Sequence, residues 1–152
     1  ALAEAARLLE SADLIRSLQL LDDLLAGDPL LAAAHLLRGL VLKRSGALAA
    51  AAAALRCARF LFSDEAWLPP YHLALILEQQ GDIARAEKLY AAIPNDAPEW
   101  PEACFRLGYL RLARGEHRAA AEAFEACLKK RPEWPEAHLN AGVAYAGLDQ
   151  PA

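Results

Sequence analysis

Methionine is absent from the 152 residues, and cysteine, tryptophan, tyrosine and phenylalanine are all scarce. The missing methionine indicates that the sequence is a fragment of a longer protein. No apolar run reaches the roughly 18 residues that a membrane-spanning helix needs, and the longest, over 47–55, is mostly alanine. No membrane partner is therefore expected, and no secretory signal pattern is present.

The three cysteines, Cys57, Cys104 and Cys127, are an odd number and have no C-x-x-C spacing. Cys104 and Cys127 fall at positions expected to pack between helices. Buried, reduced thiols are therefore favoured over a disulfide or a zinc site, which suits a cytoplasmic protein.

Catalytic motifs are also missing, since the sequence has no dinucleotide-binding glycine motif, no P-loop, no H-E-x-x-H and no G-x-S-x-G. The net charge of −4 has the wrong sign for nucleic acid. The only basic cluster, residues 129–131, falls at a predicted helix end, where cations offset the helix dipole. We therefore expect no enzyme activity, no cofactor, no metal and no nucleic-acid partner.

What the sequence does contain is a repeat. The hexapeptide Pro-Glu-Trp-Pro-Glu-Ala begins at Pro98 and again at Pro132, which are 34 residues apart. The first proline of each copy stops a helix, and the second fits the first turn of the next, where its missing N–H costs nothing. The glutamate beside it complements the helix dipole.

The same frame extends towards the N-terminus. A turn glycine recurs at 46, 81 and 115, a small residue of the first helix at 39, 74, 108 and 142, and a large residue of the second helix at 55, 90 and 124. Small residues let two helices approach closely, and large ones fill the space beside that contact. We expect Gly108 to face Ala120 across its helix pair.

The chain resembles the tetratricopeptide repeat (TPR) family through Leu107-Gly108, Ala120-x3-Phe124 and Pro132, with Cys104 and Arg111 departing from the usual Trp and Tyr. The resemblance implies an all-α fold, a right-handed solenoid of antiparallel helix pairs with about nine helices. A single array is expected over 1–152. It comprises a degenerate repeat 1–31, repeats 32–66, 67–100 and 101–134, and a final half repeat 135–152.

The TPR resemblance also implies that the first helix of each pair lines a concave groove. Apolar residues fill repeat positions 5 and 9, and polar ones lie beside them. The expected partner-binding residues are Leu36, Leu40, Lys43, Tyr71, His72, Leu75, Phe105, Arg106, Tyr109, Leu139 and Asn140. The Lys and Asn clamps by which some TPR modules hold a C-terminal carboxylate are absent. The groove is therefore expected to bind an apolar or amphipathic protein segment.

Other interpretations compete with this one. The apolar stripe could be covered by a neighbouring segment or by helix–helix contacts. The last helix, from Pro135 to about Gly147, lacks a partner helix, so the chain could self-associate through it and serve only a structural role. Packing is the simplest role for His35 and His138, and for Trp67, Trp100 and Trp134 at the joints between repeats.

A narrower resemblance rests on residues 55–62, on Tyr71-His72-Leu73-Ala74 and on Gly81-Asp82. These are similar to the TPR tails of some bacterial chemoreceptor methyltransferases. That similarity implies a regulatory or scaffolding role in chemotaxis signal transduction, although the methyltransferase core itself is not in this chain.

Overall fold

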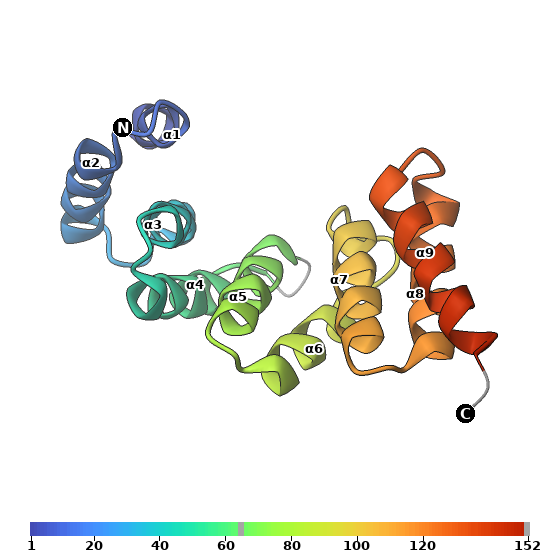
Figure 1. Cartoon of the computed structure of the whole chain (residues 1–152). Coiled ribbons are helices and arrows are strands. Elements are labelled where there is room, and N and C mark those ends of the chain that lie inside the picture. Colours follow the sequence, from blue (N-terminus) through green and yellow to red (C-terminus); the bar gives the residue numbers. More distant parts are fainter. Residues whose placement is uncertain (64–65, 151–152) are drawn as a thin grey trace. The chain divides into compact units, whose positions relative to one another are not determined.

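The computed structural model describes residues 1–63 and 66–150, and over these residues it is all-α with nine helices and no strand (Figure 1). The helices are α1 (Leu2–Glu10), α2 (Leu14–Gly27), α3 (Ala32–Arg44), α4 (Leu48–Leu61), α5 (Leu68–Gln79), α6 (Ile83–Ala92), α7 (Trp100–Ala113), α8 (His117–Lys130) and α9 (Pro135–Leu148). The all-α fold class predicted from the repeat pattern is thus confirmed. Of the repeat that we place over 32–66 and the half repeat over 135–152, residues 64–65 and 151–152 lie outside the described residues.

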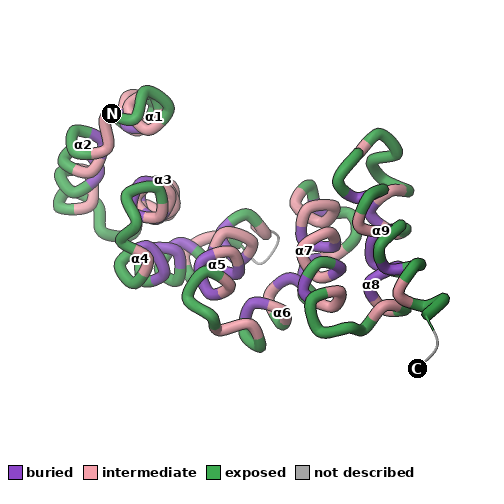
Figure 2. Tube along the Cα trace, in the orientation of Figure 1, coloured by how far each residue is buried: buried purple, intermediate pink, exposed green. Residues whose placement is uncertain are grey.

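The chain divides into two compact units, Ala1–Ala86 and Glu87–Ala152. In the first unit α3 packs against α4, and α1 and α2 pack on each other and on α3. In the second unit α8 packs between α7 and α9. Figure 2 shows buried residues along the sides of these helices that meet a neighbour, and exposed residues on their other sides.

One turn geometry joins the helices of four successive pairs. Ala12, Gly46, Gly81 and Gly115 all have positive φ, between 63° and 85°. In each turn the next residue's N–H bonds to a carbonyl five residues back, as in Asp13 to Leu8 at 2.9 Å and Glu116 to Arg111 at 3.0 Å. This is the hydrogen bond of a Schellman helix end, which usually requires glycine. The degenerate first repeat therefore keeps the repeat turn with alanine in glycine's place.

The close approach of paired helices depends on a glycine of the first helix and a large residue of the second. A Cβ at Gly39 would lie 2.6 Å from Leu55 Cγ, and one at Gly108 would lie 2.9 Å from Phe124 Cε1. Leu55 and Phe124 are fully buried. The atoms nearest to the Cβ position of Gly108 are those of the Phe124 ring, and Ala120, which we expect to face Gly108, is fully buried in one cluster with Phe124.

The packing prediction for Cys104 and Cys127 is confirmed. Cys104 and Cys127 are buried free thiols, whereas Cys57 is free and exposed on α4. The Cys104 Sγ–H donates to the carbonyl of Ala123 at 3.3 Å, and the Cys127 Sγ–H donates to that of Phe124 at 3.1 Å. Burial raises the pKa of both thiols, and that of Cys127 reaches about 11. Both are therefore packing residues held in the thiol form.

Candidate partner-binding surfaces

The first unit carries six of the expected partner-binding residues on two helices. Leu36, Leu40 and Lys43 lie on α3, and Tyr71, His72 and Leu75 lie on α5; all six are half-buried. Lys43 Nζ lies 3.5 Å from Nδ1 of His72, and the Tyr71 and His72 rings meet edge to face with centroids 5.4 Å apart. The structure therefore brings the polar residues of α3 and α5 together beside apolar side chains.

Burial sets the charge state of this polar pair. Desolvation, and then the neighbouring Lys43 charge, lower the pKa of His72 from 6.5 to about 4, so its imidazole is neutral at pH 7. Desolvation also lowers the pKa of the Lys43 ammonium. The pair thus presents one half-buried positive charge beside a neutral ring, an arrangement that favours an incoming carboxylate.

In the second unit, Phe105 is covered by other aromatic rings. Its ring stacks on Trp134 with centroids 4.7 Å apart and meets Phe124 edge to face at 5.6 Å. The guanidinium of Arg131 lies 4.3 Å from the Trp134 ring centroid and also pairs with Glu102 on α7. Trp134 accordingly packs within the unit as expected, and Phe105 belongs to a half-buried aromatic cluster.

The other expected residues of the second unit are more accessible. Tyr109 on α7 is 46% exposed, and the Arg106 guanidinium lies 5.3 Å from its ring centroid. On α9, Leu139 is 69% exposed and Asn140 is half-buried. Val143, one turn beyond Leu139, is 49% exposed. Exposed apolar side chains therefore lie on both α7 and α9, with the Arg106 guanidinium beside the one on α7.

Two histidines hold the ends of repeats through the same contact. Nε2 of His35 hydrogen-bonds the carbonyl oxygen of Pro29 at 2.9 Å, and Nε2 of His138 bonds that of Pro132 at 2.6 Å. Each proline lies six residues before its histidine. The prediction of a packed or half-buried ring holds for His35, whereas His138 is exposed in the structure.

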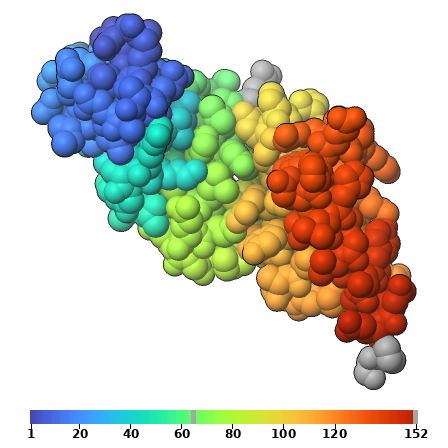
Figure 3. Space-filling model, turned by 45° about the horizontal axis from the view of Figure 1, so that its top comes forward, coloured from blue at the N-terminus to red at the C-terminus, as the bar shows by residue number. Residues whose placement is uncertain are grey.

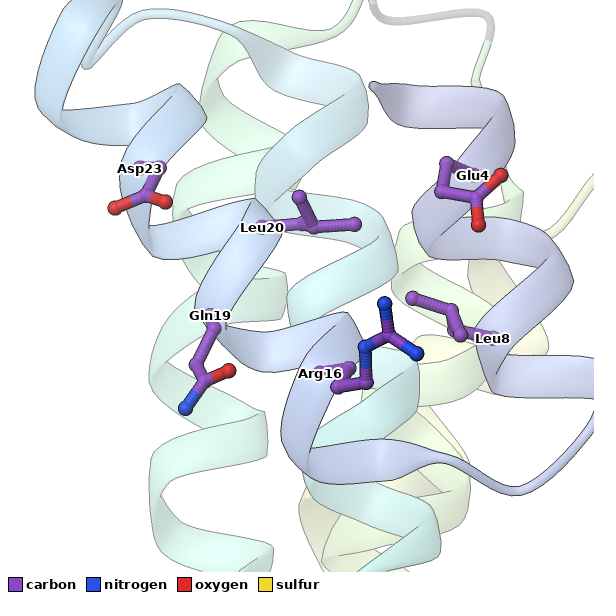
Figure 4. Close-up of a pocket in the computed structure, with 6 residues that line it drawn as sticks. All are labelled: Glu4, Leu8, Arg16, Gln19, Leu20 and Asp23. Carbon is purple, nitrogen blue, oxygen red and sulfur yellow. The ribbon is translucent and has the colours of Figure 1, made fainter.

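Sequence reasoning missed a cavity of about 260 Å³ between α1 and α2. Its lining residues are Glu4, Leu8, Arg16, Gln19, Leu20 and Asp23. Figure 4 shows the Arg16 guanidinium lying towards Leu8, with Glu4 and Asp23 at one end of the space. The four-residue spacing of 4 with 8 and of 16 with 20 places each pair on one side of its own helix, and the structure brings these two sides together around the cavity.

The part of the chain over 1–63 and 66–150 contains no cluster of His, Cys, Asp and Glu that could hold a metal ion. Within the same residues no helix has both the length and the apolar character needed to cross a membrane.

Comparison with known proteins supports the repeat assignment. Residues 105–151 match the tetratricopeptide repeat family model. No curated protein matches the sequence. The structure of the MamA protein has a TM-score of 0.81 at 21% identity, over 94% of this chain and 78% of that one.

Two further solved structures have the same fold. YrrB, described as a TPR protein with an unusual peptide-binding site, has a TM-score of 0.77 at 24% identity over 93% of this chain and 73% of its own. A tetratricopeptide repeat protein from Parabacteroides merdae has a TM-score of 0.83 at 18% identity, over 95% and 57% respectively. These matches confirm the resemblance to TPR proteins and the TPR-type helical solenoid as the fold class.

Proposed function

We propose that this chain is a protein–protein interaction module that binds an apolar or amphipathic partner segment through the first helices of its pairs. The observation that carries the proposal is the exposure of Tyr109, Leu139 and Val143 in one unit. Large apolar side chains are costly to leave in water, and aromatic ones are favourable interface anchors. The TPR-type fold, which is typically non-catalytic, supports the same class of function.

Different residues of the expected set have different roles in this proposal. Tyr109 and Leu139 are the apolar anchors of the second unit, and Phe105 supports them from within its aromatic cluster. Tyr71, Leu36, Leu40 and Leu75 offer the half-buried apolar surface of the first unit. Lys43 with His72, and Arg106 with Asn140, meet acidic or polar groups of the partner and set its direction.

The experiment begins with selection of a binding peptide from a displayed random library, followed by affinity measurements with fluorescence polarisation. Tyr109→Ala and Leu139→Ala should each weaken binding by about 1–2 kcal/mol if they are hot spots. Phe60→Ala is the matched control, because this aromatic side chain on α4 is 88% exposed and lies outside the proposed set. Lys43→Gln should weaken the binding of peptides that contain Glu or Asp more than the binding of peptides that contain neither.

Unchanged affinity for both Tyr109→Ala and Leu139→Ala, with helicity intact, would place the binding surface elsewhere. A loss caused by Phe60→Ala instead would point to α4.

The alternative function is structural, with self-association through α9 and no peptide ligand. The exposed apolar side chains of α9 favour it. Sedimentation over a range of concentrations separates the two, because self-association through α9 predicts a rising mass that Leu139→Ala and Val143→Ala lower.

The proposed setting is a regulatory or scaffolding part of a larger bacterial protein, such as a chemoreceptor methyltransferase. Its support is the similarity of residues 55–62, 71–74 and 81–82 to the TPR tails of such enzymes. Sequencing of the complete reading frame tests this setting, because it would reveal an attached catalytic domain.

A further inference from the structure

The contact between Lys43 and His72 determines which ring nitrogen of the histidine carries a proton. Lys43 Nζ on α3 lies 3.5 Å from Nδ1 of His72 on α5. An ammonium group has only donors, so Nδ1 accepts this hydrogen bond and the proton of the neutral ring is on Nε2. The Nε2–H and the remaining ammonium hydrogens are therefore the donors that this pair can offer to another molecule.

The Lys43 ammonium is half-buried and has no carboxylate partner within residues 1–63 and 66–150. In the same residues, ion pairs join five arginines to acidic side chains. A cation that loses part of its hydration without gaining a counter-ion is unfavourable, and burial lowers the pKa of Lys43 accordingly. Figure 3 shows the teal atoms of α3 and α4 adjoining the green atoms of α5 at the surface of the first unit. A counter-ion from another molecule would complete this site.

The surroundings of His72 supply a single charge that acts on its ring. The pKa of His72 is lowered to about 4, first by burial and then by the positive charge of Lys43. The helices that pack against α5 in this unit are α4 and, more weakly, α3. Other titratable groups near this end of α3, on α4 and on α5 do not contribute to the shift; they are Arg44, Arg56, Cys57, Arg59, Tyr71 and Glu78.

A carboxylate placed beside the pair would change both groups. It would accept hydrogen bonds from the Lys43 ammonium and from Nε2–H of His72, and such charge-assisted bonds are the strong ones. Because the ammonium would then bond the carboxylate instead of Nδ1, that nitrogen becomes free to take up a proton from water. The negative charge of the carboxylate also favours the imidazolium form.

We propose that Lys43 and His72 bind the side-chain carboxylate of a glutamate or aspartate in the partner segment, and that this binding is coupled to protonation of His72. This role of the pair rests on the proposed function, because the pair borders the half-buried apolar surface of the first unit. Affinity then rises as the pH falls, because the bound state holds one proton more than the free state.

The first measurement follows the four histidines of the chain by NMR during a pH titration with a blocked glutamate, N-acetyl-glutamate N-methylamide, at constant ionic strength. The pKa of His72 should move from about 4 towards 6.5 as this probe is added. The matching blocked glutamine has nearly the same size without the charge and should have no effect. His35 and His138 are internal controls, because each bonds a proline carbonyl through Nε2.

The second measurement compares an amidated peptide from the library selection that contains one glutamate with the same peptide carrying glutamine. Glutamate stays ionised above about pH 5.5. If pairing restores the pKa of His72 to 6.5, affinity for the glutamate peptide should rise about tenfold between about pH 7.5 and about 5.5. The glutamine peptide should show no such rise.

Variants of the chain separate the two groups. His72→Gln keeps a side-chain donor that cannot take up a proton, so the rise in affinity at lower pH should disappear. Lys43→Gln should weaken binding of the glutamate peptide at both pH values. Lys88→Gln is the matched control, because it removes an exposed lysine of α6 and should leave affinity unchanged.

An unchanged pKa of His72, with the blocked glutamate and in the peptide complex alike, would overturn the proposal. So would the same pH dependence of affinity in the His72→Gln chain, or a selection that returns no peptide with Asp or Glu. Binding through Lys43 of peptides that have a free C-terminal carboxylate but no acidic side chain would also refute it, because it would assign the pair to a chain terminus.

The variants also distinguish this site from the surface of the second unit. Loss of affinity with Lys43→Gln but not with Tyr109→Ala or Leu139→Ala would refute the apolar anchors of the proposed function and support the carboxylate site. The reverse pattern would refute the carboxylate site alone.

Discussion

Glycine occupies the same repeat position at 39, 108 and 142, but its surroundings differ. The effect of one substitution on stability can therefore be compared between these positions. Alanine at each adds the same single methyl group at the same place in the repeat. At Gly108 that methyl would lie 2.9 Å from the Phe124 ring, and at Gly142 it would meet nothing within 4 Å. The helix-forming benefit is shared, so the difference between variants reports the packing contact.

The expected magnitudes follow from two opposing effects. Replacing glycine with alanine inside a helix is favourable by about 0.8–1 kcal/mol, and overpacking a closed contact costs about 1–3 kcal/mol. Gly142→Ala should therefore stabilise the chain by close to 1 kcal/mol. Gly108→Ala should be neutral to destabilising by about 2 kcal/mol, because Phe124 is fully buried and its ring lies 2.9 Å from the position of the added methyl group.

Urea unfolding followed by circular dichroism measures both variants in the same compact unit, because Gly108 and Gly142 both lie within 87–152. The midpoint should rise for Gly142→Ala and stay level or fall for Gly108→Ala, with unchanged slopes. Adding Phe124→Leu should reduce the penalty at position 108 and leave the gain at 142 unaltered. Equal stabilisation by the two alanines would refute the assigned contact between Gly108 and Phe124.

Two further predictions concern titratable groups. A thiol reagent should label Cys57 rapidly in the native protein and should label Cys104 and Cys127 only on unfolding, since burial raises the pKa of those two thiols; fast labelling of all three would contradict the packing described. The pKa of His72, lowered to about 4, makes the native state bind fewer protons than the unfolded state between about pH 4 and 6.5. Stability should therefore be complete above about pH 6.5 and fall as the pH drops towards 4. His72→Gln should reduce this dependence of stability on pH. If an NMR titration gave His72 a pKa near its ordinary value, the prediction would be wrong.

The repeat was predictable from sequence because the backbone geometry at each turn and helix start restricts which residues can occupy it. A residue with positive φ must end each first helix, and glycine at 46, 81 and 115 identifies three of those turns. Proline fits only the first turn of a helix, so Pro101 and Pro135 mark two helix starts. Ala12 shows the limit of this reasoning, because its turn has the repeat geometry but lacks the glycine from which the turn could be predicted.

The accessibility of the candidate surfaces was less predictable. Phe105 and Leu139 share one repeat position, and the TPR resemblance implied that both line the groove. In the structure Trp134 stacks on Phe105 and Phe124 meets it edge to face, whereas Leu139 is 69% exposed. The spacing of residues fixes which side of a helix a residue occupies. It does not state which side chain from another segment lies over that side.

Helices α7 and α9 of the second unit are two copies of the same repeat helix. Comparing them separates the effect of repeat position from the effect of the neighbouring helix. With the same register, Gly108 is buried under Phe124 and Gly142 is open, so burial at this position is set by the neighbouring helix. The same reasoning applies to the apolar residues that face a partner. Under the proposed function, the binding energy of the second unit comes from Tyr109 and from the exposed α9 side chains Leu139 and Val143. Truncation of Phe105 would instead remove a stacked ring from the core, and its effect on binding would follow from lost stability.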